Sequence, residues 1–182
     1  MNFIIEGAGA FIYPLGLCSV AAAFIIIERL ISLRSGKVIP SRIERALYEG
    51  KIPDANGKSA AGRIVSFYRD CDSDPEALKA FAQLEVNKLE RGMFILDIVI
   101  SAAPLLGLLG TVAGLVGVFA SGDGIPSPES ISKGVGLALS TTIIGLSIAI
   151  PAIIGSAYLN RKIDKLAARL NVCIERLLNI KK

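Results

Sequence analysis

Hydroxyl side chains lie in the middle of two long apolar stretches of this sequence. Thr111 is in the first stretch, and Ser140, Thr141 and Thr142 follow one another in the second. A hydroxyl both donates and accepts hydrogen bonds, so it can serve a carboxylate in either protonation state. A Ser or Thr in a membrane helix can also bond only the carbonyl four residues earlier. Consecutive helical residues point in different directions, so we expect at least one of the three to face a protein or water interior.

Acidic residues and histidines, the usual proton carriers inside membranes, are scarce in these stretches. The chain has no histidine, and no acidic residue occurs in residues 7–27 or 134–160. Asp97 is the only acidic candidate, and we expect it near the cytoplasmic end of its helix, in an interfacial position or as a proton exit. The sequence therefore predicts a wall of hydroxyls that depends on a partner for its carboxylate.

Small residues follow the same two stretches at helical spacing. One face consists of Gly107, Gly110, Gly114 and Gly117, and the other of Ala138, Thr141, Thr142, Gly145, Ala149 and Ala152. Lipid offers helices no hydrophobic drive to associate, and small side chains let their backbones approach closely. The two faces therefore predict close helix packing and an oligomer of several copies.

Three runs without charge predict three membrane-spanning helices. They cover residues 7–27, 98–122 and 134–160, in a chain that is 52% hydrophobic with a mean hydropathy of +0.58. Each run exceeds the ~20 residues needed to cross the hydrocarbon core. The first run does not resemble a signal peptide, because its first charge is Glu6 and basic residues come only after the run.

The distribution of basic residues predicts the topology. Of the twenty Lys and Arg residues, twelve lie in residues 29–91, seven in residues 161–182, and only Lys133 lies between spans two and three. The positive-inside rule then places the N-terminus outside and the C-terminus inside, in the cytoplasm. The net charge of +4 follows from this topology, and no aromatic–basic cluster indicates a nucleic-acid partner. Cys18, Cys71 and Cys173 form no CxxC pair, and we expect neither a metal nor a cofactor.

The predicted fold is all-α, with three transmembrane helices, two of which extend into the cytoplasm. Residues 1–32 form the first span, 33–92 a cytoplasmic helical segment, 93–160 the second and third spans, and 161–182 an amphipathic cytoplasmic tail. The tail has an apolar face of Ile163, Leu166, Leu170, Ile174, Leu177 and Leu178.

Shorter patterns predict the elements of the cytoplasmic segment. We expect a helix with Ser41 as N-cap and Gly50 as its stop, a loop over residues 54–62, and a helix over residues 63–71. Asp74 and Pro75 predict the start of one long helix that enters the membrane near Met93 and continues as span two. Its apolar stripe, with Glu85 at one edge, consists of Leu78, Ala82, Val86, Leu89 and Met93.

Two segments, "APLLGLLGTVAGLVGVF" and "ALSTTIIGLSIAIPA", resemble the signature segments of the ExbB/TolQ/MotA family of proton-channel subunits. "LERGMFILDI" and "IERLISLR" are similar to the same family, and three spans with one cytoplasmic loop favour its ExbB/TolQ branch. The resemblance implies a pentameric ring in the bacterial inner membrane around a single-span ExbD/TolR-type partner with a membrane aspartate. It also implies a TonB/TolA-type protein as a further partner, and proton flow as the source of work.

The resemblance carries over to individual residues. It implies pore-lining roles for Thr111 and Thr142, and it matches Pro104 and Pro151 to prolines of the family. Leu137 occupies the place where many relatives have a glutamate, which puts a glutamate-dependent step in question. The asparagine after the "IPA" motif is also displaced, in "SAYLNRK".

Other functions remain as alternatives to a proton-driven motor. A passive membrane scaffold would use the same small-residue faces without moving protons. A solute transporter is less favoured, because three spans show no inverted repeat. An enzyme is less favoured still, because no nucleophile–base pair or metal cluster appears in the sequence.

Overall fold

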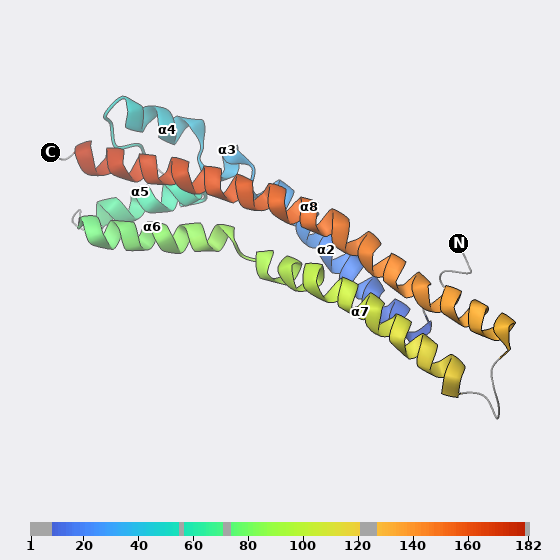
Figure 1. Cartoon of the computed structure of the whole chain (residues 1–182). Helices are drawn as coiled ribbons and strands as arrows, with labels where there is room; N and C mark the ends of the chain where they lie inside the picture. Colours follow the sequence, from blue (N-terminus) through green and yellow to red (C-terminus); the bar gives the residue numbers. More distant parts are fainter. Residues whose placement is uncertain (1–8, 55–56, 71–73, 121–126, 181–182) are drawn as a thin grey trace. The chain divides into compact units, whose positions relative to one another are not determined.

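The structure, a computed structural model, describes residues 9–54, 57–70, 74–120 and 127–180, and all regular elements among them are helices (Figure 1). They are η1 (Gly9–Phe11), α2 (Ile12–Ser32), α3 (Ser35–Val38), α4 (Ser41–Tyr48), α5 (Ala60–Asp70), α6 (Pro75–Leu89), α7 (Met93–Ala120) and α8 (Pro128–Ile180). The predicted all-α class is confirmed. The helices form two compact units. Unit 1 comprises Met1–Ile26 and Gly92–Ser156, and unit 2 comprises Ile27–Arg91 and Ala157–Lys182.

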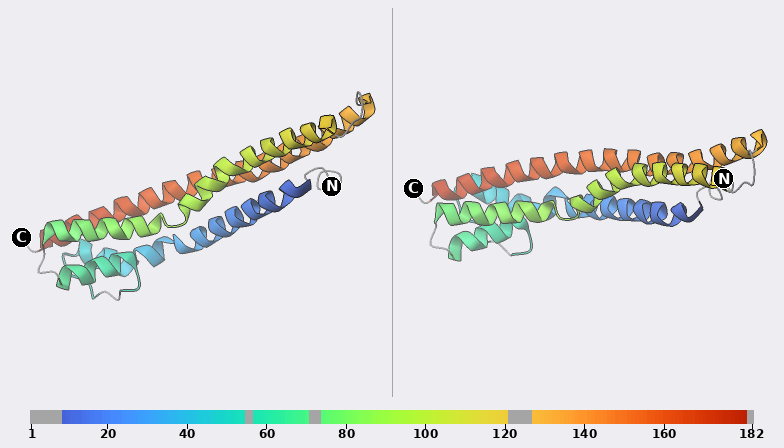
Figure 2. Two further views of the ribbon diagram at one scale, coloured as in Figure 1. Left: turned by 90° about the horizontal axis from the view of Figure 1, so that it is seen from below. Right: turned by 60° about the horizontal axis from the view of Figure 1, so that its bottom comes forward.

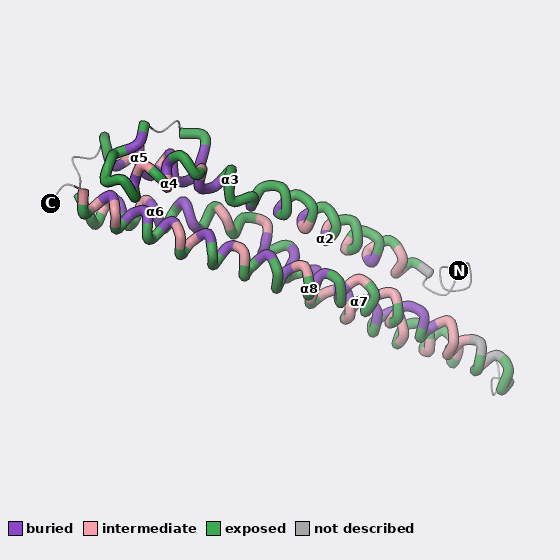
Figure 3. Tube along the Cα trace, turned by 90° about the horizontal axis from the view of Figure 1, so that it is seen from above, coloured by how far each residue is buried: buried purple, intermediate pink, exposed green. Residues whose placement is uncertain are grey.

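Among the described residues, three helices are long and apolar enough to cross a membrane, as predicted. They are Ile12–Ser32, Met93–Ala120 and the part of α8 that begins at Gly134. At 1.5 Å per residue, the 28 residues of α7 extend over about 42 Å, more than the ~30 Å of hydrocarbon. Figure 3 shows that α2 is largely exposed along its length, and Tyr13, Leu17 and Phe24 are among its exposed side chains. Apolar surface of this extent is suited to lipid rather than to water.

Unit 2 packs α3 to α6 and the end of α8 around an apolar core. In both views of Figure 2, α6 and the C-terminal part of α8 lie side by side. The predicted apolar face of the tail is confirmed, because five of its six residues are buried and Leu178 is half-buried; the five are Ile163, Leu166, Leu170, Ile174 and Leu177. A salt bridge of 2.7 Å between Arg169 and Glu44 joins α8 to α4 at the edge of this core.

The prediction of one continuous helix from Pro75 into span two is wrong, because the helix is interrupted before Met93. α6 ends at Leu89 and α7 begins at Met93. Gly92 has a φ of +88°, a conformation that glycine adopts without steric cost and that ends a helix. Nη1 of the buried Arg29 donates a 3.5 Å hydrogen bond to the Leu89 carbonyl oxygen. Leu89 is the last residue of α6, and the negative end of a helix dipole favours a cation at this position.

Two further boundaries differ from the prediction. Pro40, not Ser41, is the N-cap of α4, and no side chain caps that helix; its end near Gly50, with a φ of +70°, is as predicted. α5 begins at Ala60, inside the predicted loop, because Ser59 Oγ accepts a hydrogen bond from the Gly62 N–H as a helix cap does. Residues 55–56 of that loop and Cys71 lie outside the described residues.

Other local predictions are confirmed. Asp74 caps α6, since its Oδ1 accepts a 3.0 Å hydrogen bond from the Glu76 N–H, and Pro75 is the first helical residue. Leu78, Ala82 and Val86 of the predicted stripe are buried.

Glu85, predicted at the edge of that stripe, is instead a fully buried carboxylate. Its exposed fraction is 0%. Arg63 of α5 donates from Nε to Glu85 Oε2 at 2.8 Å and from Nη2 to the same oxygen, and Lys88 Nζ donates to Oε1 at 2.7 Å. Burial alone would raise the pKa of Glu85, but the hydrogen bonds and charges of Arg63 and Lys88 outweigh it and lower the pKa. The Arg63–Glu85 ion pair therefore joins α5 to α6 at a buried carboxylate.

A lowered pKa makes this contact acid-labile. Its stabilisation is complete above the ordinary carboxyl pKa of 4.5 and is lost as the pH falls through the lower folded pKa. We expect Glu85→Gln to lower the free energy of unfolding of unit 2 by about 1–3 kcal/mol at pH 7, because Arg63 and Lys88 lose a buried partner but remain partly hydrated. Hydrogen exchange of α5 and α6 amides between pH 7 and pH 3 measures this. The difference from wild type should shrink toward pH 3, and Glu90→Gln, at an exposed site, should change little. Parallel pH profiles for wild type and Glu85→Gln would contradict the assignment.

Candidate functional site

The backbones of α7 and α8 approach each other so closely that glycine is required on both helices. A Cβ atom added to Gly107 would lie 2.8 Å from the Thr141 carbonyl oxygen and 3.0 Å from the Thr142 Cα. A Cβ atom on Gly145 would lie 2.5 Å from the Ala103 carbonyl oxygen. Both obstacles are backbone atoms, which cannot turn aside as a side chain can. This contact sets the distance between the two helices within unit 1.

The other predicted glycines differ from these two in what surrounds them. At Gly110 a Cβ would meet the Thr141 side chain at 2.9 Å, and at Gly114 it would meet the Ala138 Cβ at 3.1 Å. At Gly117 it would meet nothing within 4 Å. The close contact therefore covers the first part of the predicted glycine face, and Gly114 and Gly117 are exposed. Ala149, from the predicted face of α8, is 2% exposed and packs inside the unit.

Three small residues that the sequence analysis did not single out belong to the same packing. Ala103 is fully buried against Gly145. A Cβ on Gly134 would collide with the Val118 side chain, and one on Gly155 would lie 2.7 Å from Ile26 Cδ1 of α2. Their small size within apolar stretches was the available signal. The partner atoms that make it matter become visible only once the helices are packed.

Thr111, Thr141 and Thr142 form one hydrogen-bonded cluster at this contact. Thr111 Oγ1 lies 2.6 Å from Thr142 Oγ1 and 3.3 Å from Thr141 Oγ1. The Gly107 carbonyl lies 2.8 Å from the Thr141 hydroxyl, 3.1 Å from that of Thr111 and 3.2 Å from that of Thr142. The Ala138 carbonyl lies 2.7 Å from the Thr141 hydroxyl and 3.1 Å from that of Thr111. Three of the four predicted hydroxyls are thus brought together.

This cluster has fewer protons than contacts. Three hydroxyls supply three protons, whereas the distances above define seven contacts within hydrogen-bonding range. Several donor arrangements are therefore possible, and they interconvert by rotation of the hydroxyl groups alone. Thr141 is 1% exposed, while Thr111 and Thr142 are half-buried. A neighbouring chain can therefore reach the cluster at Thr142 and Thr111 but not at Thr141.

Ser140 and Asp97 do not join the cluster. Ser140 is 4% exposed, and its hydroxyl donates to the Gly136 carbonyl at 3.0 Å, the local bond within its own helix. Asp97 is exposed near the start of α7, and its Oδ1 lies 3.4 Å from Ser156 Oγ of α8. Ser101 Oγ donates to the Asp97 carbonyl at 3.0 Å. Asp97 therefore belongs to a separate polar contact between the same two helices.

Comparison with known proteins identifies the family of the chain. Residues 59–172 match the MotA/TolQ/ExbB proton channel family. The chain is 28% identical to "Biopolymer transport protein exbB1" of Vibrio cholerae serotype O1, over 89% of this chain and 80% of that protein. It is 35% identical to "Biopolymer transport protein ExbB" of Helicobacter pylori strain J99, over 59% of this chain and 74% of that protein. It is 41% identical to a protein of the same name from Aquifex aeolicus, over 48% of this chain and 60% of that protein.

Gly107 and Gly117 offer a matched test of the helix contact, because both are glycines of α7 and only one faces a backbone. We expect Gly107→Ala to lower the free energy of unfolding of the spans by about 1–3 kcal/mol, since the added methyl forces α7 and α8 apart. Gly117→Ala should be neutral or slightly stabilising, because alanine favours a helix over glycine and the space is open. The free energy of unfolding of both variants is measured by denaturation in mixed detergent micelles. An equal effect of the two would show that the packing of α7 on α8 is not as described.

Proposed function

The chain belongs to the MotA/TolQ/ExbB proton channel family, and we propose that it is the ring-forming inner-membrane subunit of a motor driven by the proton motive force. The ring, a homopentamer, surrounds a single-span ExbD/TolR-type partner that carries a membrane aspartate. Through a TonB/TolA-type protein, the motor energises outer-membrane transport or envelope maintenance. The names of the relatives, which are biopolymer transport proteins, support the transport role.

The observation that carries this proposal is the half-buried Thr142 hydroxyl, 2.6 Å from that of Thr111. A carboxylate in a membrane interior costs at least ~2.5 kcal/mol unless it finds polar partners or water. Thr142 can donate to an ionised carboxylate of the partner while it accepts the proton of Thr111. Thr111 then leaves the Gly107 and Ala138 carbonyls, and the single Thr141 proton stays within range of both, at 2.8 Å and 2.7 Å.

The protonated carboxyl group can be served by the same cluster with its donors reversed. The carboxyl O–H then donates to Thr142 Oγ1, and the Thr142 proton turns to the Gly107 carbonyl, 3.2 Å away. A proton that crosses the membrane releases only about 2.3 kcal/mol per 100 mV, so neither protonation state of the carboxyl group can be a deep trap. A cluster that reverses by hydroxyl rotation meets this requirement without moving a helix.

The exposed glycines of α7 support an assembly of several chains. Gly114 and Gly117 lie on the surface of the unit, where a neighbouring helix can approach the backbone closely. We propose that this surface faces either the partner helix or the next copy of the chain. Native mass spectrometry of the chain alone and with the single-span partner tests the pentamer and the complex. A monomer in both samples would contradict the ring.

Thr142→Val tests the proposed hydroxyl pathway, because valine keeps the shape of threonine and removes the hydroxyl. We expect this variant to assemble with the partner normally, and we expect its proton-driven activity to fall by a factor of at least about ten. Thr142→Ser should keep part of the activity. The measurements are growth of a strain that depends on the complex and a pull-down of the partner.

Asp97→Asn in the same assay tests Asp97 as the cytoplasmic proton exit, and normal activity of this variant would indicate an interfacial role for Asp97.

The matched control for Thr142→Val is Ser140→Ala. It removes a neighbouring hydroxyl that bonds only the Gly136 carbonyl among the described contacts, so activity should change by less than about threefold. If Thr142→Val assembles and works as well as wild type, the cluster serves helix packing only. The chain would then fit a passive scaffold better than a motor.

The proposed topology places the N-terminus in the periplasm and the polar segments in the cytoplasm. In a background without the three native cysteines, we expect Pro126→Cys to react with an impermeant thiol reagent added to intact cells. Gly57→Cys should react only after the inner membrane is permeabilised. The reason is that nineteen of the twenty basic residues lie on the side of Gly57. Strong labelling of Gly57→Cys in intact cells, with none of Pro126→Cys, would reverse the topology.

A further inference from the structure

Unit 2 contains a basic groove of about 410 Å³, part of which is formed by residues that follow the first span along the chain. The groove lies between α3, the start of α4 and the residues that precede α5. Its charged lining residues are Lys37, Arg42, Lys58 and Asp54, three cations and one carboxylate, which gives a balance of +2. The volume lies within the ~300–1,000 Å³ that is usual for sites of small ligands.

The three cations of the groove are available to a ligand. None of the ion pairs among the described residues includes Lys37, Arg42 or Lys58, and all three side chains are exposed. The one carboxylate is already engaged, because Asp54 Oδ1 lies 3.1 Å from Arg69 Nη1, outside the groove lining. An anion that enters the groove therefore meets three uncompensated positive charges.

Ser59 adds a hydroxyl donor at the buried side of the groove. It lines the groove and is 6% exposed. Its Oγ accepts a 3.0 Å hydrogen bond from the Gly62 N–H, a bond that uses a lone pair and leaves the hydroxyl proton for another acceptor. α5 begins directly after Ser59, so the positive end of an 11-residue helix lies at the same place.

The position of the groove along the chain indicates the source of the anion. α2 ends at Ser32, and α3, which carries Lys37, begins at Ser35 within the same unit. The groove therefore follows a candidate membrane span within a few residues. Basic pockets next to a span on the cytoplasmic side are suited to anionic lipid head groups. We propose that Lys37, Arg42, Lys58 and Ser59 bind the phosphate of an anionic phospholipid at the membrane surface. This role is separate from the proposed proton pathway and does not depend on it.

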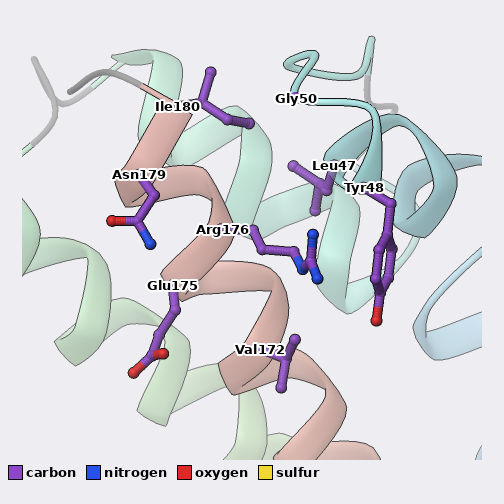
Figure 4. A pocket seen from close by; sticks show the side chains of 8 residues that line it. All are labelled: Leu47, Tyr48, Gly50, Val172, Glu175, Arg176, Asn179 and Ile180. Carbon is purple, nitrogen blue, oxygen red and sulfur yellow. The ribbon is translucent and has the colours of Figure 1, made fainter.

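A second groove of unit 2 lacks these features. It has a volume of about 560 Å³ and lies between the end of α4 and the end of α8 (Figure 4). Its cation, Arg176, points toward Tyr48 and lies 3.7 Å from the centre of that ring, and the acidic Glu175 also lines the groove. Its positive charge is thus already placed on an aromatic face. Of these two grooves, only the one beside α3 offers free cations to a phosphate.

Native mass spectrometry of the full chain tests the proposal, in micelles with equal amounts of phosphatidylglycerol and phosphatidylcholine. We expect wild type to retain phosphatidylglycerol preferentially. The triple variant Lys37→Gln, Arg42→Gln and Lys58→Gln should lower this preference by at least about tenfold, because each cation near an anionic head group contributes several-fold. Exchanging the cations, as Lys37→Arg, Arg42→Lys and Lys58→Arg, should preserve most of the preference. Equal retention of the two lipids by wild type would overturn the proposal.

The matched control removes three exposed cations elsewhere in unit 2, as Lys79→Gln, Arg161→Gln and Lys165→Gln, with the same change in net charge. It should keep the preference within about threefold, since bulk charge attraction is short-ranged and weak at ordinary salt. A loss of lipid preference equal to that of the groove variant would show charge attraction without a site and overturn the proposal.

Calorimetry with inorganic phosphate distinguishes the source of the ligand. Tight binding of free phosphate to a chain that shows no lipid preference would make the ligand a soluble phosphate and overturn the lipid assignment.

Discussion

The contact between the backbones of α7 and α8 at Gly107 and Gly145 is the constraint on which the polar site depends. A Cβ atom at Gly107 or Gly145 would lie 2.8 Å or 2.5 Å from a carbonyl oxygen of the opposite helix, so the two backbones would have to move apart. At this separation the Gly107 carbonyl comes within hydrogen-bonding range of hydroxyls from both helices. A wider separation would leave the buried Thr141 hydroxyl with bonds to its own helix only. The glycines thus bring the threonines together, although they carry no functional group themselves.

Within an apolar unit, polar groups are tolerated only when their hydrogen bonds are satisfied, and the threonine cluster meets this condition with contacts to spare. The surplus of acceptors over protons distinguishes it from an ordinary helix–helix bond, in which one donor has one acceptor. A cluster of this kind remains satisfied when a neighbouring group changes from acceptor to donor. That property is compatible with the proposed function, in which a partner supplies the carboxylate that gains and loses a proton.

Unit 2 solves a different problem, because it has to bury an apolar core while it carries most of the basic residues. Its basic residues fall into two groups, those that pair with carboxylates and those that line the groove. Arg63 and Lys88 neutralise the fully buried Glu85 between α5 and α6, and Arg169 pairs with Glu44 at the rim of the core. Lys37, Arg42 and Lys58 belong to none of the ion pairs among the described residues and remain available at the groove surface. The same residue types thus stabilise the fold in one place and present free charge in another, and a buried or half-buried carboxylate within reach decides which.

Composition and periodicity were sufficient to predict the all-α class, the three spans, the apolar face of the tail and the start of α6, because each depends on local hydrophobicity or on a cap within a few residues. The residue types of the candidate site were also evident, since hydroxyls and glycines are conspicuous in apolar stretches. Only the tertiary structure decided that Thr111, Thr141 and Thr142 share one cluster while Ser140 does not, that Gly117 is open while Gly107 is closed, and that Glu85 is buried. It also separated α6 from α7, since the single glycine between them could have continued the helix. Each of these outcomes depends on atoms contributed by a distant part of the chain, and the spacing of residues along one helix carries no information about which atoms those are.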